Sequence, residues 1–155
     1  MKQIKTNKKI KNLWSLICKT SSVDVTTNTI SLFNLIEELG LEKNKIEDTL
    51  IGHKNVFVPF TFQIITLWER GVDQKDSELE ADMKLELLDP AGEKLQEHIS
   101  RLKFQDKKAR LRAVIDTNGL KVNKPGLYKY YVGVKTDEEK DFEHVTEIPL
   151  QINFI

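Results

Sequence analysis

The chain has 155 residues with 24 basic and 24 acidic side chains, so its formal net charge is zero. This balance excludes the overall positive field that draws proteins to nucleic acid or anionic membranes, and either partner would need a local patch. The length predicts one domain over residues 1–155, large enough to fold without disulfides or bound metal, with a polar and flexible N-terminal segment over residues 1–11.

The N-terminus and the cysteine content indicate a cytoplasmic protein. The segment MKQIKTNKKIKNLW is too polar to contain the apolar core of a signal peptide, and Cys18 has no second cysteine with which to form an internal disulfide. Every apolar run is interrupted before it reaches the roughly 20 residues that a membrane-spanning helix needs. We therefore expect no membrane association.

Two segments in the first half of the chain are apolar on both faces. Residues Asn12 to Lys19 and Val58 to Trp68 are rich in β-branched and aromatic side chains. This composition is typical of strands that lie centrally in a sheet. We expect both segments to lie deepest in the fold.

The segment over residues 30–39 leaves two alternatives open. Phe33 and Leu39 fit one face of a short helix that Gly40 would cap. Against this, Thr26-Thr27-Asn28 looks like a turn that returns the chain from the first strand, after which a second strand would follow. We favour the strand and keep a short helix near residues 30–39 as the alternative.

Polar residues dominate the two longest predicted connections, over residues 42–55 and 70–80. Loops on a rigid sandwich are common places for binding residues, because they vary without disturbing the core. These two loops are therefore the expected location of a ligand site, if the protein has one.

Strict alternation of apolar and polar residues predicts four further strands. Their apolar sets are Met83-Leu85-Leu87, Leu111-Ala113-Ile115, Tyr128-Tyr130-Val132-Val134 and Ile148-Leu150-Ile152-Phe154. Asp89-Pro90-Ala91-Gly92 has the pattern of a type I turn, so residues 80–88 and 93–100 form a predicted hairpin. Asn118-Gly119 and Pro125-Gly126 are further predicted turns. Strands at this spacing predict an all-β antiparallel sandwich.

The residues that open the Tyr128 strand have the spacing of a tyrosine corner. Pro125 fixes φ, Gly126 permits a close approach, and Tyr128 is expected to hydrogen-bond the backbone of the preceding loop, residues 119–124. This turn-Gly-x-Tyr pattern resembles immunoglobulin-like sandwiches, although Tyr130 stands where such domains carry a cysteine. The resemblance implies an immunoglobulin-like sandwich without its disulfide.

The order of segments along the chain is also similar to that of small bacterial single-domain β-sandwich proteins of unknown function. The segments that carry this similarity are TNTISLFNLIEEL, VPFTFQIITLWER, the Asp-Pro-x-Gly hairpin, and PGLYKYYVGV followed by IPLQI. All of these motifs are structural. The resemblance therefore implies a fold and no activity.

The residue types that usually carry catalysis or bind metal occur here without a supporting pattern. Cys18 lies in an apolar strand, where a neutral thiol is the usual state. His53, His98 and His144 occur singly in polar surroundings, without the spacing that places two imidazoles on one metal. We therefore predict no catalytic residue, no bound metal and no cofactor.

Charged residues form two acidic clusters and two basic stretches. The acidic residues are Asp73, Asp76, Glu78, Glu80 and Asp82 in one cluster, and Asp137, Glu138, Glu139, Asp141 and Glu143 in the other. Neither has the ligand spacing of an EF-hand, so solvated loops are favoured over calcium sites. The basic stretches MKQIKTNKKIK and RLKFQDKKARLR contain only one aromatic residue for base stacking, and nucleic-acid binding is not expected.

These observations favour a non-catalytic cytoplasmic interaction or accessory module that engages another protein through a sheet face, an edge strand or a loop. The alternative is a module that binds a small molecule, sugar or calcium through the loops 42–55 and 70–80. A third hypothesis is an enzyme whose catalytic residues converge only in space. Ile65, Leu67 and Tyr131 fall on the opposite face of their strands from the core, which suggests an interface and self-association.

Overall fold

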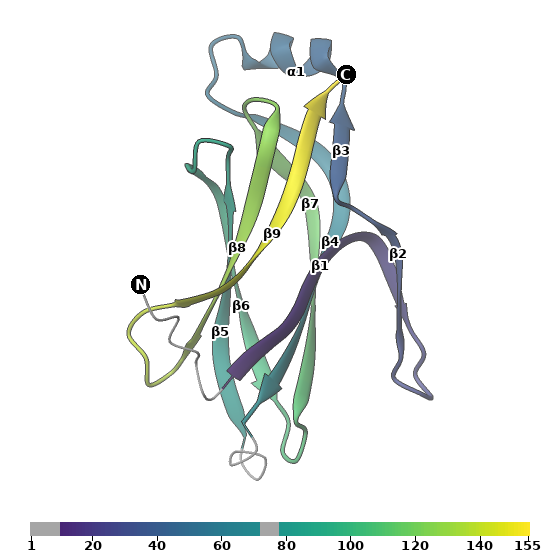
Figure 1. Ribbon diagram of the computed structural model, residues 1–155, viewed down its shortest axis with the longest axis vertical. Helices are drawn as coiled ribbons and strands as arrows, with labels where there is room; N and C mark the ends of the chain where they lie inside the picture. The colour runs from purple at the N-terminus through teal and green to yellow at the C-terminus, as the bar shows by residue number, and fades with distance from the viewer. Residues whose placement is uncertain (1–9, 72–77) are drawn as a thin grey trace.

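The computed structural model describes residues 10–71 and 78–155, which form two packed β-sheets and one short helix (Figure 1). The elements are β1 (Ile10–Val23), β2 (Ile30–Leu35), β3 (Glu38–Leu41), α1 (Lys43–Leu50), β4 (Val56–Arg70), β5 (Leu79–Leu88), β6 (Lys94–Phe104), β7 (Arg110–Val122), β8 (Gly126–Thr136) and β9 (Glu143–Phe154). This architecture confirms the predicted all-β sandwich. Of the predicted N-terminal segment, residues 1–9 lie outside the described part, and the last two residues begin β1.

One sheet has the strand order β2-β1-β4-β7, and the other has the order β3-β9-β8-β5-β6. Neighbouring strands are antiparallel, except that β3 runs parallel to β9. The two segments that are apolar on both faces, in β1 and β4, form the centre of the four-stranded sheet, as predicted. The predicted β5–β6 hairpin is also confirmed. Its turn is closed by a hydrogen bond of 2.9 Å from the N–H of Gly92 to the carbonyl of Asp89.

The segment predicted as strand or helix over residues 30–39 consists of two strands that belong to different sheets. The N–H of Ile36 donates to the carbonyl of Ile17 in the four-stranded sheet at 2.8 Å. The carbonyl of the next residue, Glu37, accepts from the N–H of Gln151 in the five-stranded sheet at 3.0 Å. The chain therefore changes sheets between residues 36 and 37, and the helical alternative for this segment is wrong because the backbone groups find partners in both sheets.

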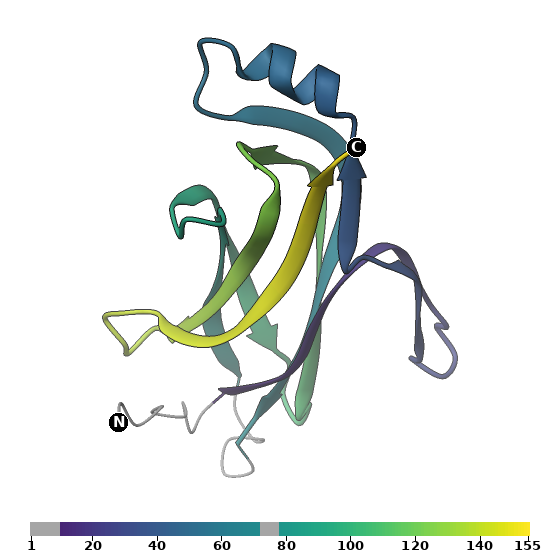
Figure 2. The same cartoon turned by 45° about the horizontal axis from the view of Figure 1, so that its top comes forward.

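The helix of the structure lies instead in the predicted loop over residues 42–55. The helix α1 lies at one end of the sandwich (Figures 1 and 2). Ile46 is its one buried residue and belongs to the hydrophobic core. A helix of eight residues depends on such packing rather than on intrinsic propensity. It is neither long nor apolar enough to span a membrane, and no other helix occurs among the described residues.

Two further predictions about connections can be compared with the structure. Most of the predicted loop over residues 70–80 falls on residues 72–77, which lie outside the described part. The predicted turn at Asn118-Gly119 is wrong, since β7 continues to Val122. Gly119 is required there for a different reason: a Cβ atom would lie 2.3 Å from the carbonyl oxygen of Val58, so only glycine allows the two strands to approach this closely.

Candidate binding cleft between the two sheets

The sandwich is open along the side where β6 and β7 form the edges of the two sheets. At one end of this side, the connection between β6 and β7 is held by the buried Arg70, whose guanidinium donates to the carbonyls of Lys108 at 2.7 Å and Gln105 at 2.8 Å. At the other end, the N–H of Lys121 donates to Oε1 of Gln96 at 2.8 Å. The two edges are therefore joined at both ends and separated between them.

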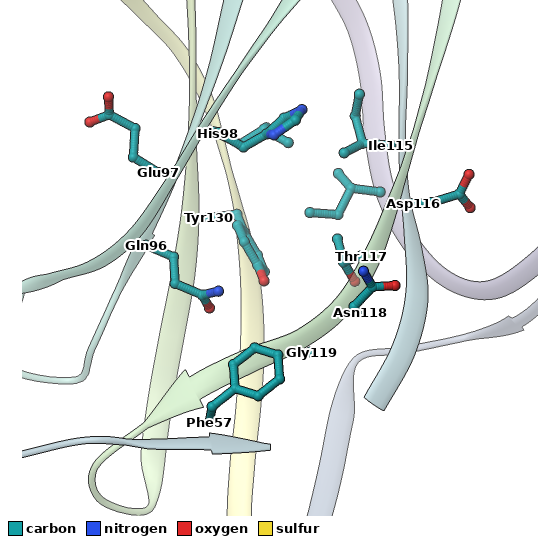
Figure 3. A pocket seen from close by; sticks show the side chains of 12 residues that line it. Phe57, Gln96, Glu97, His98, Ile115, Asp116, Thr117, Asn118, Gly119 and Tyr130 are labelled. Atoms are coloured by element: carbon teal, nitrogen blue, oxygen red, sulfur yellow. The ribbon is translucent and has the colours of Figure 1, made fainter. Parts of the chain in front are cut away.

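A cleft of about 340 Å³ occupies this separation. Residues from five strands line it, and they are Phe57, Ile64, Leu85, Gln96, Glu97, His98, Ile115, Asp116, Thr117, Asn118, Gly119 and Tyr130. Ile64 and Leu85 form an apolar floor that belongs to the core, whereas the residues of β6 and β7 form two polar walls. Figure 3 shows the Tyr130 ring in the middle, between Gln96 and His98 on one side and Thr117 and Asn118 on the other.

Tyr130 is the buried polar group of this cleft. Its side chain is 6% exposed, and burial raises the pKa of its phenol well above the ordinary value. Its hydroxyl borders the cleft and makes no hydrogen bond to any other residue that the structure describes. A ligand or a water molecule in the cleft would satisfy it.

Some polar side chains in the two walls already have hydrogen-bond partners within the chain, and others do not. Thr117 donates its hydroxyl to the carbonyl of Phe62 at 3.2 Å, and Asp116 accepts from the Gln63 amide at 2.8 Å. The side chains of His98 and Asn118 make no hydrogen bond within the described part of the chain. These two therefore remain available at the rim of the cleft.

The sequence contains one signal for this cleft, in the inward-facing residues of β6. In β6, the positions that face inward by register with β5 are Gln96, His98, Ser100, Leu102 and Phe104. An inward-facing set that changes from apolar to polar along one strand indicates that only one half of the strand packs on the core. Two of the three polar residues, Gln96 and His98, line the cleft.

The predicted tyrosine-corner residues lie at the opposite end of β8 from its acidic turn. The hydroxyl of Tyr128 accepts from the N–H of Asn123 at 3.0 Å and of Lys124 at 3.2 Å, and it donates to the carbonyl of Lys124 at 2.7 Å. The loop that it holds is shorter than predicted, because β7 ends at Val122 and β8 begins at Gly126.

The same corner also contacts the β5–β6 turn. Asp89 accepts from the Asn123 amide at 2.7 Å and from the N–H groups of Ala91 at 2.8 Å and Glu93 at 2.9 Å. Burial by itself raises the pKa of Asp89, but these hydrogen bonds together outweigh it and hold the pKa below its ordinary value. Gly126 has φ +143°, and a Cβ atom there would lie 2.8 Å from the ring of Pro90. The two turns thus pack into one unit.

The three residues predicted for an interface have different surroundings. Ile65 is fully buried although it lies outside the main core cluster, so its side chain cannot contribute contact area to an interface. Leu67 lies two residues further along the same strand, so it shares the face of Ile65, and it is half-buried. Tyr131 is also half-buried and stacks on the imidazole of His144, with the ring centroids 4.3 Å apart.

Carboxylates from both acidic clusters meet at one arginine, which the sequence did not predict. Arg101 donates to Glu80 and Asp82 of the first cluster, at 2.8 and 3.0 Å, and to Asp137 of the second at 2.7 Å. The hydrogen bond from Arg101 lowers the pKa of Asp137. These three carboxylates are each paired with an arginine of the chain itself. Residues 73 and 76 of the first cluster lie outside the described part.

The remaining candidates for chemistry lie apart from one another. Cys18 is buried in β1, and this burial raises the pKa of its thiol. His98 borders the cleft, and His53 and His144 are exposed elsewhere. Across residues 10–71 and 78–155, no group of three or more His, Cys, Asp or Glu side chains is arranged so that it could hold a metal ion.

No family model matches the chain, and no curated protein matches it.

Proposed function

We propose that the protein is a non-catalytic interaction module that binds an extended segment of a partner protein along the cleft between β6 and β7. The observation that carries this proposal is the cleft itself, a cavity of about 340 Å³ that has an apolar floor and lies between the edge strands β6 and β7. The partner segment pairs with one edge through backbone hydrogen bonds, and one of its side chains fills the cavity.

Both edges are suited to this kind of pairing. β6 has 11 residues and β7 has 13, and neither contains a proline that would remove a backbone donor. Each has a neighbouring strand on one side only among the described residues, so half of its backbone N–H and C=O groups face outward. The N–H of Lys121 illustrates this, because its partner is the Gln96 side chain rather than another strand.

The cavity limits the side chain that a partner can insert. Its volume lies at the lower end of the range of about 300 to 1,000 Å³ that is typical of small-molecule pockets. An aromatic or large aliphatic side chain would pack on Ile64 and Leu85, and a polar atom at its end would reach the Tyr130 hydroxyl. Tyrosine and tryptophan, which combine an apolar ring with a polar atom, fit this environment best.

A second candidate function is the binding of a small molecule in the same cleft. The observation that favours it is the Tyr130 hydroxyl, which borders the cleft and has no hydrogen-bond partner among the described residues. Such a ligand would place an apolar ring over the floor and a hydrogen-bonding group against Tyr130. The cleft, rather than the loops 42–55 and 70–80, is then the site of the small-molecule alternative.

A peptide selection tests the leading proposal. A displayed library of random peptides of about ten residues, long enough to form a strand, is selected against the protein, and binding is measured by fluorescence polarisation. His98→Trp introduces bulk at the rim of the cleft and should weaken binding by at least about tenfold. His53→Trp makes the same substitution at an exposed histidine outside the cleft and should leave binding unchanged.

The outcomes separate the two candidate functions. Selected peptides whose binding is insensitive to His98→Trp would contradict the cleft proposal. The small-molecule function would replace the interaction function if two results occur together. The selection would yield no peptide, and phenol or aromatic amide fragments would raise the melting temperature of the wild type but not that of Tyr130→Phe.

A further inference from the structure

A second cavity, of about 530 Å³, is lined by residues of β7, the end of the β1–β2 hairpin, β6 and the β6–β7 connection, together with Leu67 of β4. Leu67 pairs with Arg112 and Ile65 pairs with Val114, so these residues share the outward face of the four-stranded sheet. The hairpin, which projects from the sandwich in Figures 1 and 2, is joined to this face by a hydrogen bond of 3.2 Å from Arg112 to the carbonyl of Asn28.

The side chains that line this cavity carry charge of one sign. Its lining contains Lys103, Lys108, Arg110 and Arg112 and no aspartate or glutamate. Arg110 is paired with Glu69 at 3.0 Å, and Lys103 lies 3.9 Å from Glu80. Lys108 and Arg112 contact no carboxylate among the described residues. The cavity therefore has an uncompensated positive charge.

Arg112 is the residue that points to a ligand. Its Nε is buried and has no hydrogen-bond partner, and it is the one buried side-chain nitrogen or oxygen in this state within residues 10–71 and 78–155. Removing an arginine nitrogen from water without a partner is unfavourable, because the charged group loses hydration. Arg101, by contrast, contacts three carboxylates on the other sheet.

We propose that this cavity binds an organic anion, with its carboxylate or phosphate group on Arg112 and Lys108 and its apolar part on Leu67 and Val114. A planar guanidinium matches the geometry of either oxyanion, and a charge-assisted hydrogen bond would offset the hydration that Arg112 has lost. The apolar wall, which also includes Val23 and Leu111, distinguishes such a ligand from an inorganic ion.

The site is independent of the proposed interaction function. The linings of the two cavities share no residue, although each includes residues of β6 and β7.

Titration of the isotope-labelled protein with benzoate, phenyl phosphate and inorganic phosphate, at about 150 mM salt, tests the proposal. Benzoate or phenyl phosphate should shift the amide resonances of Leu67, Arg112 and Val114 and should bind at least about tenfold more tightly than inorganic phosphate. Whichever organic anion binds more tightly identifies the charged group.

Three variants complete the test. Arg112→Met should weaken binding of the organic anion by at least about tenfold, whereas Arg101→Met removes an arginine from the opposite sheet and should leave it unchanged. Lys108→Gln, at an exposed position, gives a second readout and should weaken binding less.

Three results would overturn the proposal: equal binding to wild type and Arg112→Met, no shift at Arg112 with any probe, or tighter binding of a single-stranded DNA oligomer than of the small anions. Arg112→Met should leave peptide binding unchanged, and His98→Trp should leave anion binding unchanged. These two controls distinguish a failure of this proposal from a failure of the proposed interaction function.

Discussion

Tyr128 and Tyr130 lie two residues apart on the same face of β8, yet their hydroxyl groups meet different surroundings. The Tyr128 hydroxyl bonds to the backbone of the β7–β8 loop and so joins the two strands at a corner. The Tyr130 hydroxyl reaches the cleft between β6 and β7 and has no partner in the described part of the chain. The same residue type on one strand thus serves stability at one position and offers a binding group at the other.

The difference arises from what lies across the sandwich at each point. At the corner, the β5–β6 turn packs so closely on the start of β8 that a Cβ atom on Gly126 would have no room beside Pro90. Further along β8, the edges β6 and β7 separate and leave the floor of the cleft partly uncovered. The tightly packed corner at one end of β8 therefore fixes the position of the strand that lines the open cleft further along.

The largest effect is expected at the corner itself. Gly126→Ala places a Cβ atom where φ is +143° and where it would lie 2.8 Å from Pro90. Strain and overpacking together should lower the free energy of unfolding by about 2 to 4 kcal/mol, measured by urea denaturation. Gly133→Ala, in the same strand but without a positive φ, is the control and should cost less than about 1 kcal/mol. Equal losses in the two variants would show that the corner has no special strain.

A pair of tyrosine variants tests the comparison most directly. Tyr128→Phe removes the partner of two backbone N–H groups and should lower the free energy of unfolding by about 1 to 3 kcal/mol. Tyr130→Phe removes a hydroxyl that has no partner among the described residues and should change it by less than about 0.5 kcal/mol. Urea denaturation measures both values, and a larger loss for Tyr130→Phe than for Tyr128→Phe would reverse the assignment of roles.

The pH dependence of stability should identify the corner network. The pKa of Asp89 is lower in the folded than in the unfolded protein, so its contribution is present above an unfolded value of about 3.9 and disappears as the pH falls through the folded value. We expect wild type to be more stable than Asp89→Asn near neutral pH, and the difference to vanish in acid. A difference that stays constant between about pH 7 and pH 2 would contradict a role for the ionised carboxylate.

The smallest expected effect concerns ionisation in the cleft. Burial raises the pKa of Tyr130, so its phenol should remain protonated at about pH 10, where an unburied tyrosine is half ionised. Folded wild type and Tyr130→Phe should therefore show the same phenolate absorbance at that pH, and unfolding in urea should reveal one additional ionisable tyrosine in the wild type. Additional phenolate absorbance in the folded wild type would contradict the raised pKa of Tyr130.

Much of the fold could be predicted because its signals are local. Alternating side chains mark β5, β7, β8 and β9, and the Asp-Pro-Ala-Gly turn sets the β5–β6 hairpin. The errors concern positions where distant segments decide. Residues 36 and 37 bond to different sheets, α1 depends on the packing of Ile46, and Gly119 serves a close approach rather than a turn.

The candidate sites were predicted less completely than the strands. The corner spacing of Pro125, Gly126 and Tyr128 is visible in the sequence because all three residues act within one turn. The cleft residues come from five strands, and the carboxylates that meet at Arg101 come from β5 and from the residues after β8. No spacing along the chain reveals such groupings.

The sequence by itself therefore determined the strands, the tight hairpin and the residue types of the corner, since these depend on the side-chain periodicity of a strand and on the backbone limits of proline and glycine. Only the tertiary structure decided that β6 and β7 separate, that Tyr130 rather than Tyr128 faces the opening, and that Arg112 is left without a carboxylate partner among the described residues. The reason is physical: burial and charge compensation depend on which strands become neighbours in space, and that choice is made by the whole chain at once.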